Sequence, residues 1–240
     1  MADAMLSISG LSAGYGDVQV LWGIDLEVPR GGIACLIGSN GAGKTTLMRT
    51  ISGLVPARSG SVRFEGRELA RADPAAALAA GIAQVPEGRR LFAAMSVRDN
   101  LLMGAYLRGD GRAAIEADLE KAFAMFPILR QRQRQDAGTL SDGEQQMCAL
   151  ARGLMGRPTL LLVDELSLGL APMVVDELCE TLRTLNAEGL TILVVEQDVA
   201  TALELASTAF VMDTGRVTRS GPSAALRDDP AIREAYLGTI

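Results

Sequence analysis

Hydrophobic and polar residues alternate along two stretches near the N-terminus, Leu6–Leu11 and Gln19–Val28. Because successive side chains of a strand point to opposite faces, this pattern predicts two half-buried strands. The stretch Gly32–Ile37 is apolar throughout, which is typical of a strand buried on both faces. A glycine-rich turn follows, and residues 44–52 are patterned as a helix that Gly53 is placed to end. The chain therefore begins with strands and one early helix.

The middle third of the chain is patterned mainly as helices. Asp73-Pro74 is a favourable helix start, and Gly81 is a favourable stop. Ser96–Asp99 has capping-box spacing, with Asp in the usual Glu place, and is expected to open a helix that ends near Leu107. Helical spacing returns over residues 113–126. These helices are expected to form a separate region of the fold.

Two short strands and one polar run complete this region. Ser61–Phe64 with the turn Glu65-Gly66 suggests a hairpin, and Ile82–Val85 suggests a short buried strand. Arg130–Asp136 alternates Arg with Gln before its final Asp. We interpret this run as a solvated helix face or a loop rather than a binding segment.

The last third of the chain alternates strands with helices. Strands are predicted at Leu160–Asp164, Thr191–Glu196 and Ala209–Asp213, and helices at Val174–Asn186 and Ala200–Leu205, before a Thr214-Gly215 turn and a short terminal helical region. Strand–helix alternation predicts a mainly parallel sheet with helices on both faces. The helical middle is therefore interpreted as an insertion into an α/β core.

Composition narrows the class of protein. The 240 residues are 48% hydrophobic and 22% charged, which is ordinary for a compact globular protein. The net charge of −6 argues against nucleic acid as a general partner, although a local basic patch for phosphates stays possible. Histidine is absent, which excludes any catalytic or metal site built on histidine. Cys35, Cys148 and Cys179 lack metal-ligand spacing and are expected to be isolated reduced thiols.

The sequence gives no sign of a membrane span or an export signal. No apolar run approaches the roughly 18 residues that a bilayer requires. The first residues, Met1–Ala4, lack the basic flank and long apolar stretch of a signal peptide. We therefore expect a cytosolic location.

The glycine-rich turn matches the phosphate-binding loop G-x-x-x-x-G-K-[S/T]. The matching residues are Gly38, Ser39, Asn40, Gly41, Ala42, Gly43, Lys44 and Thr45, and Thr46 directly after them is expected to contact the same nucleotide. Glycines let the backbone wrap around phosphates, and the helix N-terminus adds positive potential. Lys44 should reach the β- and γ-phosphates, and Thr45 should bind Mg²⁺ through its hydroxyl. An eight-residue match can occur by chance, but its position between a buried strand and a helix favours the functional interpretation.

Two carboxylates end the apolar strand Leu160–Asp164. Asp164 is placed to hold Mg²⁺, and Glu165 to orient and deprotonate an attacking water. The alternative is a strand whose acidic end simply meets solvent. The phosphate loop favours the catalytic interpretation.

A third motif is Leu140–Gln145, which contains Ser141, Asp142, Gly143 and Glu144. A Ser-x-Gly turn before a helix can donate a hydroxyl and an amide to a phosphate, but it can equally be only a helix N-cap. Ser141 lies 23 residues before Asp164. This order of motifs favours the phosphate-contacting role.

Together these motifs resemble those of ABC transporter nucleotide-binding subunits, over essentially the whole chain. Smaller features are similar to the branched-chain amino acid importer ATPases, the LivF-like group: Val85–Phe92, Ser167–Pro172, Val195–Asp198 and the ending Arg233–Gly238. The resemblance implies a P-loop NTPase fold of the ABC ATPase type. It would combine a RecA-like, mainly parallel α/β core, an N-terminal antiparallel β-subdomain (both within residues 1–87 and 157–240) and an inserted helical subdomain (residues 88–156). All of these would form one domain over residues 1–240.

The resemblance also implies roles for single residues. Tyr15 matches the aromatic residue that stacks on adenine, although a packed core tyrosine is the alternative. Glu87 falls where most ABC ATPases have a glutamine that senses Mg²⁺ and the membrane subunit, whereas Gln84 lies within a predicted strand and is not that residue. Ser167–Leu170 match the loop that crosses the dimer interface. Gln197 stands where most of the superfamily has a histidine that contacts the γ-phosphate, and its amide can donate a hydrogen bond but carry no proton.

Two residues depart from the family pattern. Asp142 replaces the first glycine of the signature pair, and its carboxylate would repel a γ-phosphate about 4 Å away by up to several kcal/mol at an intermediate dielectric. The alternative, which we favour, is that Asp142 points away and acts as a turn residue that tolerates the left-handed region. Leu166 replaces the proline that usually follows the two carboxylates, which is expected to loosen that turn modestly.

The resemblance implies an ATP-hydrolysing subunit that works with Mg²⁺ and energises an importer of branched-chain or related amino acids. Its partners would be transmembrane permease subunits and a sister ATPase or a second copy of the chain, and indirectly a solute-binding protein, at the inner face of the membrane. Two chains would sandwich two ATP molecules, each between the phosphate loop of one chain and Ser141 and Gly143 of the other. The alternatives are a weakly hydrolysing regulatory partner and a soluble ABC ATPase of repair or translation, which usually has paired cassettes.

Overall fold

Strands and helices alternate along the computed structural model, which describes residues 4–237. Residues 1–3 of the N-terminal stretch and Gly238 of the family-like ending lie outside the described residues. The strands are β1 (Ala4–Tyr15), β2 (Val18–Pro29), β3 (Ile33–Ile37), β4 (Ala57–Phe64), β5 (Arg67–Glu68), β6 (Ile82–Val85), β7 (Leu160–Asp164), β8 (Thr191–Val195), β9 (Thr208–Asp213) and β10 (Arg216–Pro222). The helices are α1 (Lys44–Ile51), α2 (Pro74–Ala80), α3 (Val97–Met103), α4 (Arg112–Met125), α5 (Pro127–Gln131), α6 (Asp142–Leu154), α7 (Pro172–Ala187), α8 (Val199–Leu205), α9 (Ser223–Asp228) and α10 (Pro230–Ile232), with a 3₁₀ turn at Ala137–Thr139 and a π-helical turn at Arg233–Leu237.

A six-stranded sheet in the order β10-β9-β3-β8-β7-β6 forms the centre of the fold. Its strands are parallel except β10, which runs antiparallel to β9. The carboxyl ends of β3, β8 and β7 therefore meet at one edge, with Leu36 beside Val195 and Val195 beside Asp164. This register brings the phosphate loop after β3 close to the carboxylates at the end of β7.

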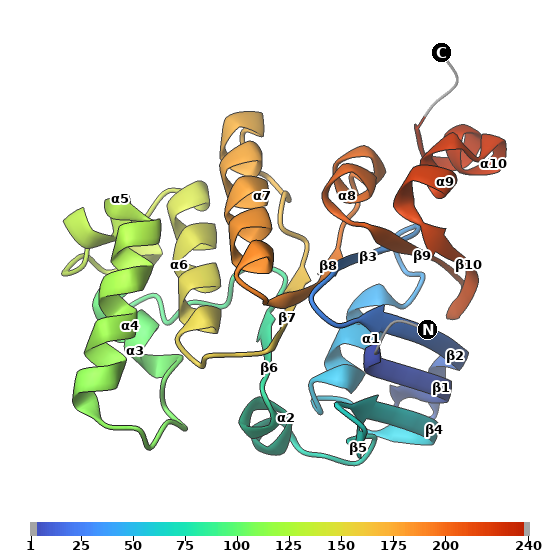
Figure 1. Cartoon of the computed structure of the whole chain (residues 1–240), viewed down its shortest axis with the longest axis horizontal. Coiled ribbons are helices and arrows are strands. Elements are labelled where there is room, and N and C mark those ends of the chain that lie inside the picture. The colour runs from blue at the N-terminus through green and yellow to red at the C-terminus, as the bar shows by residue number, and fades with distance from the viewer. Residues whose placement is uncertain (1–3, 238–240) are drawn as a thin grey trace.

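A second, antiparallel sheet has the order β2-β1-β4-β5 and contains the predicted N-terminal strands. In Figure 1 it lies beside α1 at the opposite end of the molecule from α3–α6. Those four helices lie between β6 and β7 in the sequence, as expected for an inserted helical region. The α/β architecture with two sheets confirms the predicted fold class, whereas the subdomain bounds at residues 88 and 156 stay a prediction.

Two hydrophobic clusters cover the two faces of the six-stranded sheet. In β7, Leu161 and Val163 belong to the cluster under the helices, while Leu160 and Leu162 belong to the cluster against the antiparallel sheet. The strands β3 and β8 divide their residues in the same alternating way. Both faces are therefore buried, which is why these strands are continuous apolar runs in the sequence.

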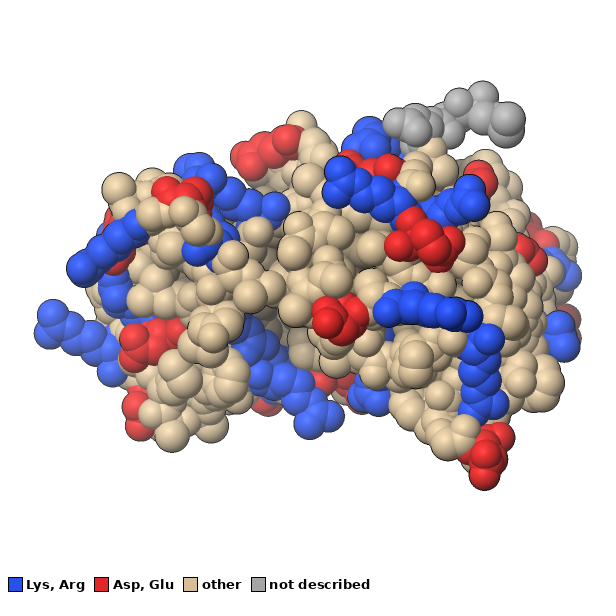
Figure 2. Space-filling view, turned by 90° about the horizontal axis from the view of Figure 1, so that it is seen from below, with Lys and Arg blue, Asp and Glu red and all other residues tan. Residues whose placement is uncertain are grey.

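The surface is charged but mixed. On the face shown in Figure 2, basic and acidic side chains are interspersed over the molecule. In the part of the chain that the structure describes, no helix is long and apolar enough to cross a membrane. The three cysteines are buried free thiols, as expected.

Several predicted boundaries are wrong for identifiable reasons. The helix opened by Ser96 ends at Met103 rather than near Leu107, because the N–H groups of Gly104, Ala105 and Tyr106 bond to carbonyls three residues back and form tighter turns than an α-helix. Helix α7 begins at Pro172, two residues before the predicted start, because proline is favourable in a first turn. Strand β10 was not predicted, since most of its side chains are exposed and show no clear alternation. The predicted stop at Gly81 is confirmed by its left-handed backbone, with φ of 108°.

Candidate functional site

The phosphate loop connects the end of β3 to the start of α1. Gly38 has φ of 151°, and a Cβ added there would lie 2.1 Å from the backbone oxygen of Met212. Gly43 has φ of 102° and caps α1 without a side chain. Since the first N–H groups of a helix have no intrahelical acceptor, the start of α1 offers donors to an anion.

Lys44 is buried, and its ammonium group lies within the loop. Its Nζ donates to the carbonyl oxygens of Gly38 and Ser39 at 2.7 and 3.0 Å. Burial lowers the pKa of Lys44, while the nearby Glu165 and Asp164 oppose this effect. The ammonium group is thus held in the loop by two uncharged carbonyl oxygens, and a negatively charged phosphate can replace them as its acceptor.

Asp164 lies at the buried end of β7, with 1% of its surface exposed. The Thr45 hydroxyl donates to its Oδ1 at 3.5 Å, and its buried Oδ2 has no hydrogen-bond partner among the described residues. Burial raises the pKa of Asp164 to about 6, and the charges of Glu165 and Glu87 add to this rise. A positive charge or a metal ion beside Asp164 would reduce the free-energy cost of burying its ionised carboxylate.

The residues around Asp164 fit a magnesium ion. Mg²⁺ is bound in nucleotide sites by one or two carboxylates, a hydroxyl, phosphate oxygens and water. Asp164 supplies an unpaired buried oxygen and Thr45 a hydroxyl beside it. Among residues 4–237, no group of three acidic, cysteine or histidine side chains could hold a metal alone. The protein ligands therefore suit a cation that arrives with phosphates.

Glu165 follows directly and adopts a left-handed conformation, with φ of 57°. Its N–H donates to the Val195 carbonyl at 2.9 Å, and its Oε1 accepts a 2.6 Å hydrogen bond from Nε2 of Gln197. Its Oε2 is buried without a partner among the described residues. A non-glycine residue in this region is strained, and such strain is typical of functional sites.

One cavity of about 440 Å³ is lined by nine of the predicted site residues, although Asp164 is not among them. Its lining residues are Val20, Asn40, Gly41, Gly43, Lys44, Thr45, Thr46, Glu87, Glu165 and Gln197. Gln84 instead lies in β6, where it accepts a hydrogen bond from Ser52, as expected for a residue outside the site. The cavity therefore joins the phosphate loop, with Lys44, to the other two predicted catalytic side chains, Glu165 and Gln197.

Tyr15 lies at the end of β1, outside the lining of this cavity. It is 43% exposed, so the packed-core alternative is wrong. Its hydroxyl accepts from Arg49 at 3.3 Å and from Thr46, a cavity residue, at 3.5 Å. The exposed ring is available for stacking, and adenine binding stays a prediction.

The signature residues line a different cavity, of about 490 Å³. Its lining includes Ser141, Asp142, Gly143, Glu144, Gly169 and Leu170. Ser141 caps α6: its hydroxyl accepts from the Glu144 N–H, and the Glu144 carboxylate accepts from the Ser141 N–H at 2.9 Å. The prediction that Ser141 is a helix N-cap is therefore confirmed within one chain. The signature motif lines a different cavity from the phosphate loop of the same chain.

Asp142 is the first residue of α6, and its φ is not among the positive values. The prediction of a left-handed turn residue is therefore wrong, because the capped helix already begins here. Its carboxylate instead pairs with the guanidinium of Arg89 at 2.5 Å. Arg89 belongs to the segment after Glu87, and nothing in its local sequence apart from the basic pair Arg89-Arg90 pointed to this contact.

Glu196 is a second residue without a predicted role. It is 1% exposed at the end of β8, and its Oε1 and Oε2 accept hydrogen bonds from the N–H and hydroxyl of Ser167 at 2.9 and 2.7 Å. Its position beside Gln197 in the motif Val195–Asp198 was the available signal. The contact spans 29 residues and could not be found from local pattern.

A phosphate loop at the edge of a parallel sheet, with two carboxylates ending a neighbouring strand, defines a P-loop nucleotide-binding protein. The ABC transporter family model matches residues 21–167, and the chain belongs to this family. It is 44% identical to a high-affinity branched-chain amino acid transport ATP-binding protein, BraG, of Pseudomonas aeruginosa, over 98% of this chain and 100% of that protein. It is 32% identical to a probable protein of this kind, LivF, of Archaeoglobus fulgidus, over 98% and 100%. A crystal structure of a nucleotide-free ATP-binding cassette from an ABC transporter is similar with a TM-score of 0.85 and 26% identity, over 99% of this chain and 100% of that one.

Proposed function

We propose that this chain is the ATP-hydrolysing subunit of an ABC importer for branched-chain or related amino acids. The convergence of Lys44, Thr45, Asp164, Glu165 and Gln197 on one edge of the sheet carries the proposal of hydrolysis. The substrate class is supported by the names of the relatives BraG and LivF. ATP and Mg²⁺ are the implied substrate and cofactor.

The roles of the residues follow from their chemistry. The N–H groups of the loop and the Lys44 ammonium bind the β- and γ-phosphates. Thr45 and Asp164, with Glu87 nearby, would hold Mg²⁺, which would neutralise charge on the phosphates. Glu165 orients and deprotonates the attacking water, and the amide of Gln197 holds one oxygen of the Glu165 carboxylate.

The signature motif is proposed to act on the ATP of a second subunit. It lines a separate cavity from the phosphate loop, which supports a composite site between two chains. Each ATP would lie on the phosphate loop of one chain and meet Ser141 and Gly143 of the other. The second chain is a sister ATPase or another copy. ATP closes the pair, and hydrolysis reopens it.

An apolar groove is proposed to receive the permease. This groove has a volume of about 550 Å³ and lies between α2, β6 and the helical region. Its lining includes the exposed side chains Leu54, Phe92, Met103, Tyr106 and Leu107, and Pro86 beside Glu87. Docking here would place the chain in the cytoplasm at the inner face of the membrane, with a solute-binding protein acting only through the permease.

A weakly hydrolysing regulatory partner is the alternative, and Asp142 is the observation that favours it. The ion pair with Arg89 weakens this alternative, because it neutralises the carboxylate within its own chain. The intact Glu165–Gln197 pair also supports hydrolysis.

The test is steady-state ATPase activity of the wild type and Glu165→Gln at saturating Mg-ATP. Activity that falls at least about a hundredfold in the variant, with ATP binding retained, supports the proposed role of Glu165. Absent activity in the wild type, even with its sister ATPase and permease added, would favour the regulatory alternative. Uptake of labelled leucine by the reconstituted transporter tests the substrate class separately.

A further inference from the structure

The buried carboxylate of Glu196 has no part in the chemistry proposed above, although it lies directly beside the reacting residues. Burying a carboxylate costs free energy unless hydrogen bonds satisfy it. Burial raises the pKa of Glu196, whereas hydrogen bonds from Ser167 and from the backbone of Gln197 and Leu166 oppose the rise. Both carboxylate oxygens accept hydrogen bonds from Ser167, which follows Glu165 by two residues. The carboxylate therefore fixes the chain next to the site.

Glu196 closes a ring of contacts between the ends of β7 and β8. On one side its carboxylate holds Ser167, the first residue of the predicted interface loop. On the other side its chain neighbour Gln197 donates to the Glu165 carboxylate at 2.6 Å. Leu166 connects Ser167 to Glu165 along the chain. A shift of the loop would therefore be transmitted to the Glu165 carboxylate by two routes.

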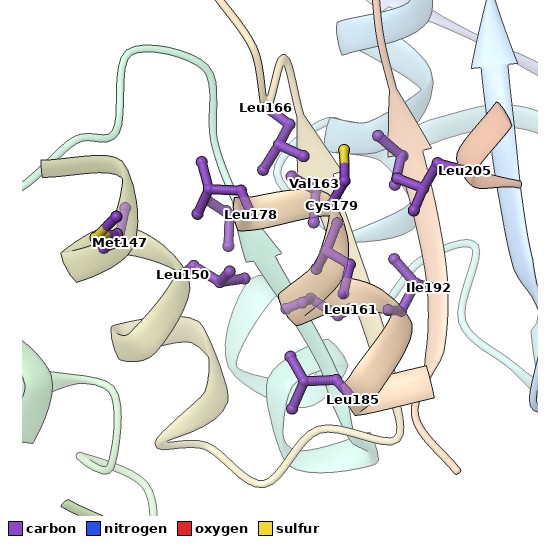
Figure 3. Close-up of a cluster of buried hydrophobic side chains, with 14 of the residues drawn as sticks. Met147, Leu150, Leu161, Val163, Leu166, Leu178, Cys179, Leu185, Ile192 and Leu205 are labelled. Atoms are coloured by element: carbon purple, nitrogen blue, oxygen red, sulfur yellow. The ribbon is translucent and has the colours of Figure 1, made fainter. Parts of the chain in front are cut away.

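Leu166 strengthens this arrangement. Its backbone N–H, a group that proline lacks, helps to oppose the rise in the pKa of Glu196. Its side chain is 1% exposed. Figure 3 shows it in the cluster under α7, close to Leu178 and Cys179. Leucine at this position therefore anchors the turn from inside and keeps a backbone N–H that favours the ionised form of Glu196.

We propose that Glu196 is a positioning residue that locks the Ser167 loop to the Glu165–Gln197 pair. Through this lock, the orientation of the hydrolytic carboxylate depends on the loop that would face the second subunit. The inference rests on the proposed ATP hydrolysis, since it assigns Glu165 as the base.

The first test is Glu196→Gln, which keeps the shape but replaces one acceptor oxygen with an NH₂ group. We expect kcat for ATP to fall about tenfold or more, because small displacements of a catalytic group are costly, while KM changes less than about twofold. Ser167→Ala should lower kcat less. The double variant should be no slower than Glu196→Gln, because both substitutions disrupt the same contact, that between Ser167 and Glu196.

Asp118→Asn is the matched control. Asp118 is also a buried carboxylate, but it lies on α4, pairs with Arg108 and Arg157, and does not line the cavity of the phosphate loop. This variant should lower the melting temperature and leave kcat per folded molecule unchanged. The same result for Glu196→Gln would overturn the inference and leave a purely structural role.

Amide hydrogen exchange gives a readout that does not require hydrolysis. In Glu196→Gln, peptides covering residues 165–171 should exchange at least about tenfold faster than in the wild type, whereas in Asp118→Asn they should not. Unchanged exchange in these peptides would overturn the lock even if ATPase activity fell. A wild type that does not hydrolyse ATP would refute the proposed function instead, and the exchange data would still test the lock.

Discussion

The guanidinium of Arg89 lies 2.5 Å from the carboxylate of Asp142, joining the segment after Glu87 to the start of α6. Arg89 is the more enclosed partner, with 17% of its side chain exposed against 64% for Asp142. Arg152 of α6 fixes the same segment by donating to the carbonyl oxygens of Arg89 and Arg90. The charge of Asp142 is therefore balanced within its own chain before a second subunit brings ATP.

This relationship predicts a non-additive pair of substitutions. Arg89→Ala should raise KM for ATP about fivefold or more, because it leaves Asp142 uncompensated near the γ-phosphate. In an Asp142→Gly background the same substitution should have little effect. A double-mutant cycle on steady-state ATPase kinetics measures the coupling.

Arg90→Ala is the control for this cycle, because Arg90 has the same left-handed backbone and the same contact from Arg152 to its carbonyl. It should leave KM unchanged. Equal effects of Arg89→Ala in both backgrounds would contradict a compensating role for the ion pair.

The raised pKa of Asp164 predicts that, without a metal ion, the charged Asp164 carboxylate lowers the stability of the folded protein. The folded-state pKa of about 6 exceeds the unfolded value of 3.8, so the folded protein binds more protons between these values. The contribution of Asp164 to the free energy of unfolding is therefore fully present below about pH 4 and is lost as the pH rises through about 6, by about 3 kcal/mol at most. Asp164→Asn should therefore be more stable than the wild type at pH 7.5 and nearly equal at pH 4.

Urea unfolding without Mg²⁺ and ATP checks this difference. Asp176→Asn, which changes an exposed carboxylate on α7, should show no such dependence on pH. Mg-ATP should stabilise the wild type and not Asp164→Asn. A constant gap between the wild type and Asp164→Asn across this pH range would exclude a raised pKa of Asp164.

The sequence predicts those parts of the fold that are determined by residues close together along the chain. The strands β3, β7 and β8 were found because burial on both faces requires continuous apolar runs. The phosphate loop was found because its chemistry requires a fixed local spacing. Strand β10 was missed because an exposed edge strand needs no such pattern.

The contacts that the sequence did not predict join distant segments. Arg89 and Asp142 are 53 residues apart, and Ser167 and Glu196 are 29 apart. Each pair joins segments that only the tertiary structure brings together, so no periodicity or spacing in the sequence marks it. The role of Asp142 was mistaken for the same reason, since both its helical start and its partner depend on tertiary structure.

The apolar groove predicts a surface variant that separates assembly from nucleotide binding. Tyr106 is 78% exposed at its edge and lies among other exposed apolar side chains. Tyr106→Glu should weaken co-purification with the permease at least about tenfold, because a charge in an apolar interface is costly, and leave ATP affinity unchanged. Val18→Glu, an equally polar change on β2 outside the groove, should keep co-purification intact. If Tyr106→Glu still co-purified with the permease, the groove would not be the docking surface.

Gly38 predicts a steep stability difference between two glycine substitutions. A Cβ at Gly38 would lie 2.1 Å from the Met212 backbone oxygen, whereas a Cβ at Gly16 would have no atom of residues 4–237 within 4 Å. Both glycines have positive φ, so Gly16→Ala carries the conformational cost alone, about 1 kcal/mol. Gly38→Ala adds a backbone clash and should cost about 3 kcal/mol or more. Urea unfolding of both variants checks this order, and equal losses would mean that β3 and β9 can separate at the phosphate loop without penalty.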